Sequence, residues 1–144
     1  MELSLEDRLQ LHELPGRYGD AIDDRNWDNL RKIFTTDAVF DLTGVGSRPL
    51  NGIEDIVSFM ENEAAHPRTH MMTNIYVDPG PDGLDSAELR FRIVALIGGG
   101  KTGTASYYDK VVKTPDGWRV QHRVTTLRRR DKRQAFVDVE GIAL

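Results

Sequence analysis

The second half of the chain decides the fold, and its clearest stretch is residues 102–128, TGTASYYDKVVKTPDGWRVQHRVTTLR. Two extended runs, Thr102–Lys113 and Trp118–Arg128, flank a Pro-Asp-Gly turn, and this pattern predicts a β-hairpin. Two more extended segments precede them, Thr69–Val77 and Ser86–Ile97, and glycine or proline stands in each break. The sequence therefore predicts a meander of four long antiparallel strands.

The first half of the chain predicts helices. Ser4 opens a Ser-Leu-Glu-Asp sequence typical of a helix N-cap, and apolar residues then recur at helical intervals from Leu9 to Ile22. Pro15 lies inside this segment, so a kink or a restart near Leu14 is expected there. We predict a long first helix with a local distortion.

Three shorter elements follow this helix. Asn26 is positioned to cap a second helix from Trp27 to about Phe34, Ala38–Leu42 is a short strand candidate, and a third helix is predicted from about Ile53 to Ala64. Helices first and an antiparallel sheet second are typical of an α+β domain with the helices on one face of the sheet. Long strands curve, and a curved sheet covered by helices leaves a hollow in which a pocket can form.

The composition is that of one globular domain. The chain has 144 residues, of which 39% are hydrophobic and 29% charged. Its net charge of -4 disfavours nucleic acid as a partner, and the absence of cysteine excludes disulfides, thiolate nucleophiles and sulfur-ligated zinc. No stretch approaches the ~20 apolar residues that span a bilayer. We expect no membrane partner and a cytoplasmic location.

Three motifs that imitate functional sites are better explained by local structure. Gly98–Thr102 resembles a phosphate-binding loop, but a strand is predicted where that motif requires a helix. His66 and His70 have the spacing of a metal-binding helix, yet Pro67 breaks such a helix, and in a strand their side chains would lie ~13 Å apart. No metal is therefore expected. The basic run Arg128–Arg133 lacks interleaved aromatic residues and is expected to form a solvated turn or a subunit contact.

Two polar residues stand where a pocket is expected. Asp23 lies at the end of the first predicted helix, about 140° round from Tyr18 and on the margin of the apolar face. His70 begins the first long strand and shares a face with Met72 and Asn74, a mixed surface typical of a pocket lining. Each also has a plain structural interpretation, as a solvated helix end and a hydrogen-bonded histidine.

Arg123, in the last predicted strand, is a third candidate. Strict alternation from Trp118 places Arg123 on the opposite face of the sheet from the tryptophan. Parity alone does not decide which of the two faces lines the pocket.

The candidates stand in a characteristic order along the chain: Tyr18–Asp23 followed by Trp27, Thr69 and His70 with Thr73 and Asn74, and Asp116–Val120 with Arg123. In this order and spacing the chain resembles the SnoaL-like group of the nuclear transport factor 2-like superfamily, which contains polyketide cyclases, dehydratases and dehydrochlorinases. The resemblance implies one domain over residues 1–144, with a cone-shaped, curved, mixed or antiparallel sheet and three helices around a central pocket. It also implies a homodimer or homotrimer, with residues 131–144 as a tail at a subunit interface.

The resemblance also implies roles for individual residues. In the dehydrochlorinases of the group an Asp-His dyad abstracts a proton and an arginine helps the departing group, and Asp23, His70 and Arg123 look like the counterparts. A tyrosine found in a bile-acid dehydratase makes Tyr18 an expected acid or hydroxyl donor. The physical reason for the dyad is that an imidazole is a better base when its other nitrogen donates to a carboxylate. The residues expected to line the pocket are Trp27, Met72, Asn74 and Tyr108.

These roles predict a lyase or isomerase that needs no cofactor, similar to a dehydratase or cyclase, acting on a small to medium hydrophobic substrate. Two alternatives stay open. The chain could be a non-catalytic ligand-binding or assembly module of the same fold, because fold alone does not fix function. It could also be an epoxide hydrolase or aldol cyclase that uses the same pocket. The sequence does not separate elimination from isomerisation, cyclisation or hydrolysis.

Overall fold

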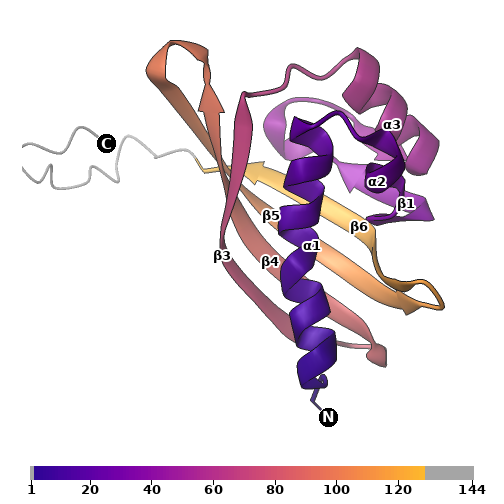
Figure 1. The fold of residues 1–144 in the computed structure, drawn as a ribbon. Coiled ribbons are helices and arrows are strands. Elements are labelled where there is room, and N and C mark those ends of the chain that lie inside the picture. The colour runs from indigo at the N-terminus through magenta and orange to yellow at the C-terminus, as the bar shows by residue number, and fades with distance from the viewer. Residues whose placement is uncertain (1, 129–144) are drawn as a thin grey trace, which may run out of the picture.

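The computed structural model describes residues 2–128, in which three α-helices pack on a curved sheet (Figure 1). Within this range the helices are α1 (Leu5–Asp23), α2 (Trp27–Arg31) and α3 (Ile53–Asn62). The strands are β1 (Phe34–Asp41), β2 (Pro49–Asn51), β3 (Thr69–Gly80), β4 (Gly83–Ile97), β5 (Lys101–Thr114) and β6 (Gly117–Leu127). The predicted α+β class is confirmed.

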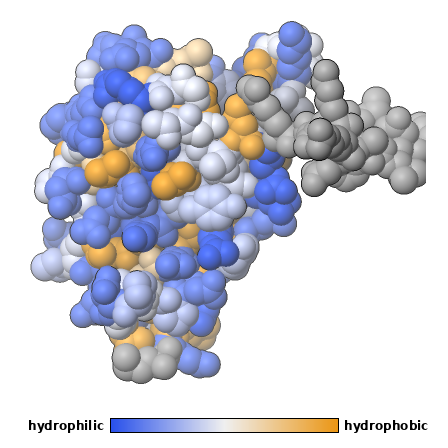
Figure 2. Space-filling view, turned by 180° about the vertical axis from the view of Figure 1, so that it is seen from behind, coloured by the Kyte–Doolittle hydropathy of each residue, from blue (hydrophilic) through white to orange (hydrophobic). Residues whose placement is uncertain are grey.

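The described part of the chain forms one six-stranded sheet in the order β2-β1-β6-β5-β4-β3. Strands β3 to β6 are the predicted antiparallel meander, and β1 adds to it by running parallel to β6. The sheet is therefore mixed. Figure 1 shows α1 lying lengthwise across one face of the sheet, with α2 and α3 gathered at one end. Seen from behind, the molecule carries small apolar patches separated by hydrophilic residues (Figure 2).

The start of α1 is fixed to the far end of the meander. Ser4 caps the helix by accepting a hydrogen bond from the backbone N–H of Asp7. The Asp7 carboxylate in turn accepts a hydrogen bond of 2.9 Å from Nε1 of the buried Trp118 and pairs with Lys113 at 2.9 Å. Two segments more than a hundred residues apart in sequence are thereby joined, and α1 is held across the sheet.

Three predicted boundaries are corrected by the structure. The helix α1 continues through the buried Pro15 with no restart near Leu14. The second helix ends at Arg31, and Phe34 belongs to β1. The reason is tertiary pairing: the backbone of Val120 in β6 donates to the carbonyl of Ile33. This pairing with β6 outweighs the local helical spacing, and it starts β1 four residues before the predicted strand.

A β-bulge at Gln121 reverses the predicted orientation of Arg123. In the pairing of β5 with β6, Lys110 faces His122 whereas the next residue of β5 faces Val120, so Gln121 is an extra residue. An extra residue shifts the alternation of side chains beyond it to the other face. As a result Trp118 and Arg123 are both buried on the inner face of the sheet. The prediction that they lie on opposite faces is wrong for this reason.

Candidate active site

The structure places Asp23 and His70 in direct contact. Asp23 is the last residue of α1 and His70 is the second residue of β3. Oδ1 of Asp23 lies 2.6 Å from Nδ1 of His70, and Oδ2 accepts hydrogen bonds from the His70 backbone N–H at 2.8 Å and from the Thr69 hydroxyl at 3.0 Å. The side chains of Asp23 and His70 are 14% and 8% exposed. Each carboxylate oxygen therefore has its own partner in a place that water scarcely reaches.

These hydrogen bonds favour an ionised Asp23 and fix the tautomer of a neutral His70. Burial by itself raises the pKa of Asp23, but the backbone N–H and ring of His70 and the Thr69 hydroxyl outweigh it and lower that pKa below the usual 3.8. An ionised carboxylate only accepts hydrogen bonds, so Nδ1 of His70 must be the donor. The lone pair of a neutral His70 is then on Nε2, which has no hydrogen-bond partner among residues 2–128.

His70 opens on a cavity of about 360 Å³ between α1, α3 and the inner face of the sheet. This volume is within the range of small-molecule pockets. Glu63, His66 and Ser47 supply polar groups to the lining, and the rest of it is largely apolar. The other lining residues are Tyr18, Ile22, Phe40, Leu42, Val45, Phe59, Met60, Ala64, Ala65, Pro67, His70 and Tyr107. A hydrophobic molecule can thus lie against the imidazole.

The four residues expected to line the pocket lie elsewhere. Trp27 packs beside the ring of His66, with centroids 6.3 Å apart, and Met72 lies under Gly19 of α1. Asn74 is exposed in a left-handed conformation with φ of 52°, at an irregularity of β3. Tyr108 is 44% exposed and its ring contacts the guanidinium of Arg90. None of the four borders the cavity.

Tyr107 takes the place that was predicted for its neighbour Tyr108. It is 5% exposed, lines the cavity and packs edge-on against Tyr18, with ring centroids 5.9 Å apart. Tyr107 lies on the same face of β5 as Asp109 and Val111, which are also buried. The face of β5 that carries Tyr107 also carries Asp109, and a face with an aspartate is expected to point to solvent. The burial of Tyr107 could therefore be predicted only together with the inward position of Arg123.

Arg123 is fully buried behind the two tyrosines and does not border the cavity. Its Nε and Nη2 donate to the two carboxylate oxygens of Asp109 at 2.8 and 2.7 Å. Its guanidinium carbon lies 4.2 Å from the ring centroid of Tyr18 and 4.8 Å from that of Tyr107. Phe34, Phe40 and Phe91 surround it at 5.1–5.3 Å. The cation thus forms the centre of an aromatic cluster.

Burial in this cluster leaves both tyrosines neutral. Burial raises the pKa of Tyr18 well above its usual value, and it also raises the pKa of Tyr107 although the guanidinium of Arg123 opposes this. Burial alone would lower the pKa of Arg123, but the carboxylate of Asp109 outweighs it and raises that pKa. Two neutral tyrosines therefore line the same cavity as His70, and the Arg123–Asp109 ion pair lies behind them.

Within residues 2–128 no three His, Cys, Asp or Glu side chains are grouped so that they could hold a metal ion. His66, the second histidine of the cavity, directs Nε2 to the Met60 carbonyl at 2.5 Å. No helix in this range is long and apolar enough to cross a membrane.

Comparisons with known proteins agree with this architecture. The family model described as "SnoaL-like domain" matches residues 3–124. An uncharacterized protein of Mycobacterium tuberculosis, Rv2910c, is 31% identical over 128 residues, which cover 85% of this chain and 86% of the relative.

Two solved structures illustrate the likeness. A protein of Novosphingobium aromaticivorans, provisionally described as an aromatic ring hydroxylase, is 28% identical with a TM-score of 0.74, over 90% of this chain and 94% of that one. Hexachlorocyclohexane dehydrochlorinase LinA-type3 of Novosphingobium barchaimii is 18% identical with a TM-score of 0.70, over 88% of this chain and 92% of that one. At 18% identity the second likeness shows the fold alone.

Proposed function

The chain belongs to the SnoaL-like domain family, and on this premise we propose that it is a lyase or isomerase, similar to a dehydratase or cyclase, that works without a cofactor. Proteins of the same fold include a dehydrochlorinase. The observation that carries the proposal is the 2.6 Å hydrogen bond between Asp23 and His70 at the edge of a largely apolar cavity. The substrate would be a small to medium hydrophobic molecule.

His70 is the base in this proposal. Its Nε2 lone pair accepts a proton from a carbon next to an activating or leaving group. In an elimination the electrons of that C–H bond form a new double bond as the bond to the leaving group breaks and the leaving group departs with its electron pair; next to a carbonyl they form an enolate. The imidazole then becomes an imidazolium, which the carboxylate of Asp23 stabilises through Nδ1. A base positioned in this way accelerates proton transfer by typically about 10²–10⁴-fold.

Tyr18 and Tyr107 are the hydrogen-bond donors in this proposal. Both residues line the cavity and their hydroxyls stay protonated, so in this proposal they donate to an oxygen or a leaving group on which negative charge develops. Arg123 acts through them, because it is stacked on both rings and is already paired with Asp109. We therefore assign Arg123 a positioning role rather than the direct contact with the departing group that the resemblance implies.

The alternatives use parts of the same site. An epoxide hydrolase or an aldol cyclase would direct Nε2 at a water molecule or at a different C–H bond. A non-catalytic carrier would need the cavity but not the hydrogen bond from His70 to Asp23, and an assembly module would need neither, so the presence of that bond favours catalysis.

The assembly and extent of the protein are also proposals. We propose one domain over residues 1–144 that forms a homodimer or homotrimer in the cytoplasm. The predicted interface tail, residues 131–144, lies outside the described residues. Light scattering of the full chain and of a chain ending at residue 133 would test the tail, and an equal number of chains per assembly would contradict its role.

The function can be tested before the natural substrate is known. 5-Nitrobenzisoxazole is a small aromatic molecule that undergoes elimination when a base removes its ring proton, and the product absorbs visible light. We expect the wild-type protein to catalyse this elimination with saturation kinetics, and His70→Gln to lower kcat by about 10²–10⁴-fold, as for the loss of a general base.

The matched control is His122→Gln, because His122 lies in β6 and does not border the cavity. It should leave kcat unchanged. If both substitutions had the same effect, or if His70→Gln were as active as wild type while the probe is seen bound in the cavity by NMR, the proposal would be wrong.

A further inference from the structure

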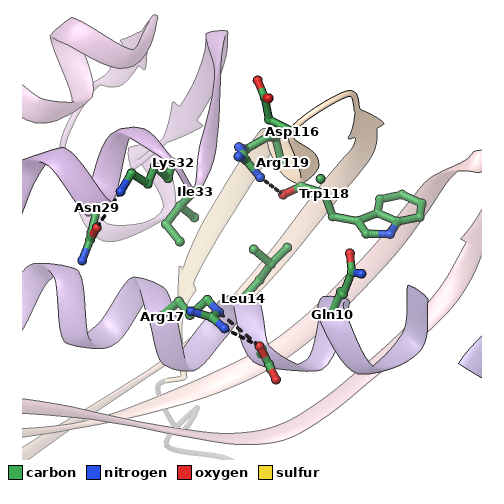
Figure 3. Close-up of a pocket in the computed structure, with 11 residues that line it drawn as sticks. Gln10, Leu14, Arg17, Asn29, Lys32, Ile33, Asp116, Trp118 and Arg119 are labelled. Atoms are coloured by element: carbon green, nitrogen blue, oxygen red, sulfur yellow. Dashed lines mark hydrogen bonds and ion pairs between the residues drawn. The ribbon is translucent and has the colours of Figure 1, made fainter. Parts of the chain in front are cut away.

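A second cavity, of about 370 Å³, lies between α1, α2 and the turn that joins β5 to β6 (Figure 3). It shares no lining residue with the cavity beside His70. Helix α1 borders both, because Arg17 and Tyr18 are consecutive and so project about 100° apart around the helix. The second cavity is therefore separate from the proposed catalytic site but lies on the same helix.

Three cationic side chains border this cavity, and two of them have no carboxylate partner among residues 2–128. Arg17 pairs with Glu13 at 2.6 Å. Lys32 contacts only the side-chain oxygen of Asn29, at 3.3 Å. The half-buried Arg119 donates from Nη1 to the carbonyl of its own neighbour, Trp118, at 2.9 Å. Lys32 and Arg119 thus keep N–H donors for a ligand.

The floor between these cations is apolar. Leu14, Ile33 and Trp118 are 6%, 3% and 2% exposed and all border the cavity. Figure 3 shows Leu14 of α1 and Ile33, just after α2, pointing toward each other, with Lys32 and Arg119 beside them. An apolar floor with a few charged groups at its edge is the usual make-up of a site for a small organic ligand.

We propose that this cavity binds a small organic anion, an aryl or alkyl carboxylate. Its carboxylate lies between Lys32 and Arg119, and its apolar body lies on Leu14 and Ile33. A guanidinium matches a carboxylate through two parallel hydrogen bonds, and such charge-assisted bonds are stronger than neutral ones.

The charges around the cavity favour a carboxylate over a phosphate. Glu13 and Asp116 also border it, so a dianion would meet more repulsion than a singly charged carboxylate. The protein carries a net charge of -4, which gives an anion no long-range attraction. Binding must therefore come from the short contacts with Lys32, Arg119 and the apolar floor.

The test uses 2-naphthoate as the probe and the full chain labelled with ¹⁵N. We expect saturable shifts at the backbone N–H groups of Lys32, Ile33 and Gly117, and weaker binding of the matched neutral compound naphthalene-2-methanol. The double variant Lys32→Gln/Arg119→Gln should bind 2-naphthoate at least ~10-fold more weakly, as expected for the loss of hydrogen bonds to a charged group.

A control variant carries the same change of charge elsewhere. Arg92→Gln/Lys110→Gln removes two exposed cations of β4 and β5 that do not border this cavity, and it should keep the wild-type affinity. His70→Gln should also keep it, which separates this site from the proposed function. Equal affinity for the neutral compound, equal affinity in the Lys32→Gln/Arg119→Gln variant, or shifts confined to the cavity beside His70 would each overturn the proposal.

Discussion

Replacing Asp109 by Asn should destabilise the protein strongly, although the two side chains have nearly the same shape. Asp109 accepts two hydrogen bonds from Arg123, at 2.8 and 2.7 Å, and both side chains are 0% exposed. The substitution removes the negative charge and leaves a guanidinium that water cannot reach. Nη1 of Arg123 already has no hydrogen-bond partner among the described residues, so the cation has little else to compensate it.

The size of the effect follows from burial. Removing one partner of a buried ion pair costs about 3–5 kcal/mol. Five aromatic rings lie 4.2–5.3 Å from the guanidinium carbon and retain part of the stabilisation, which places the effect near the lower end of that range. For a domain of this size a loss of about 3 kcal/mol lowers Tm by roughly 6–12 °C.

The assay is urea unfolding and thermal unfolding followed by circular dichroism, with Glu54→Gln as the matched control. Glu54 also receives two hydrogen bonds from one arginine, Arg31, at 2.9 and 3.0 Å, but this pair is on the surface. The two pairs therefore have similar hydrogen-bond geometry and differ in burial. The control should lose only a small fraction of the free energy of unfolding that Asp109→Asn loses. Equal losses of the free energy of unfolding in the two variants would refute the reasoning.

Three further predictions concern single residues. Hydrogen bonds, of which the one from Lys113 contributes most, lower the pKa of Asp7 from 3.8 to about 2. The ionised Asp7 therefore stabilises the fold above pH 3.8, and this stabilisation is lost as the pH falls toward 2. The free energy of unfolding should fall more steeply over that range in wild type than in Asp7→Asn. A Cβ at Gly44 would overlap a backbone oxygen of β6, so Gly44→Ala should cost about 1–3 kcal/mol in urea unfolding, whereas Gly98→Ala, in open space, should be neutral. Tyr107→Phe should lower kcat for 5-nitrobenzisoxazole while the fold is retained; an unchanged kcat would remove its hydroxyl from the mechanism.

The meander was predictable because its turns and strands are determined by residues that are neighbours in the sequence. The turns around Gly83, Gly99 and Gly117 all contain glycines with positive φ, and β3 to β6 lie where the four extended segments were predicted. The first and third helices begin within a residue of their predicted starts for the same reason, since caps and apolar spacing are read from neighbouring residues. These features do not depend on what packs against them.

The rest depended on partners that are distant in sequence. No glycine or proline marks the bulge at Gln121, and only the register against β5 shows that Arg123 turns inward. That inward turn explains why Asp109 is buried, and with it why Tyr107 rather than Tyr108 faces the cavity. The start of β1 likewise needs β6 beside it.

The candidate site shows the same division. Asp23 and His70 are 47 positions apart, and neither helical spacing nor strand alternation brings them together. Their pairing was expected from the resemblance alone. What the structure adds is the cavity beside them, the two bonds that hold Oδ2 of Asp23, and the free Nε2 of His70.

The most direct test of the account is a double-mutant cycle on kcat for 5-nitrobenzisoxazole with wild type, His70→Gln, Asp23→Asn and the double variant. Asp23 acts only through His70 in this account, so the effects of the two substitutions on kcat should be strongly non-additive. Asp23→Asn should lower kcat in the wild-type background and have no further effect once His70 is Gln. An equal loss from Asp23→Asn in both backgrounds would contradict the dyad.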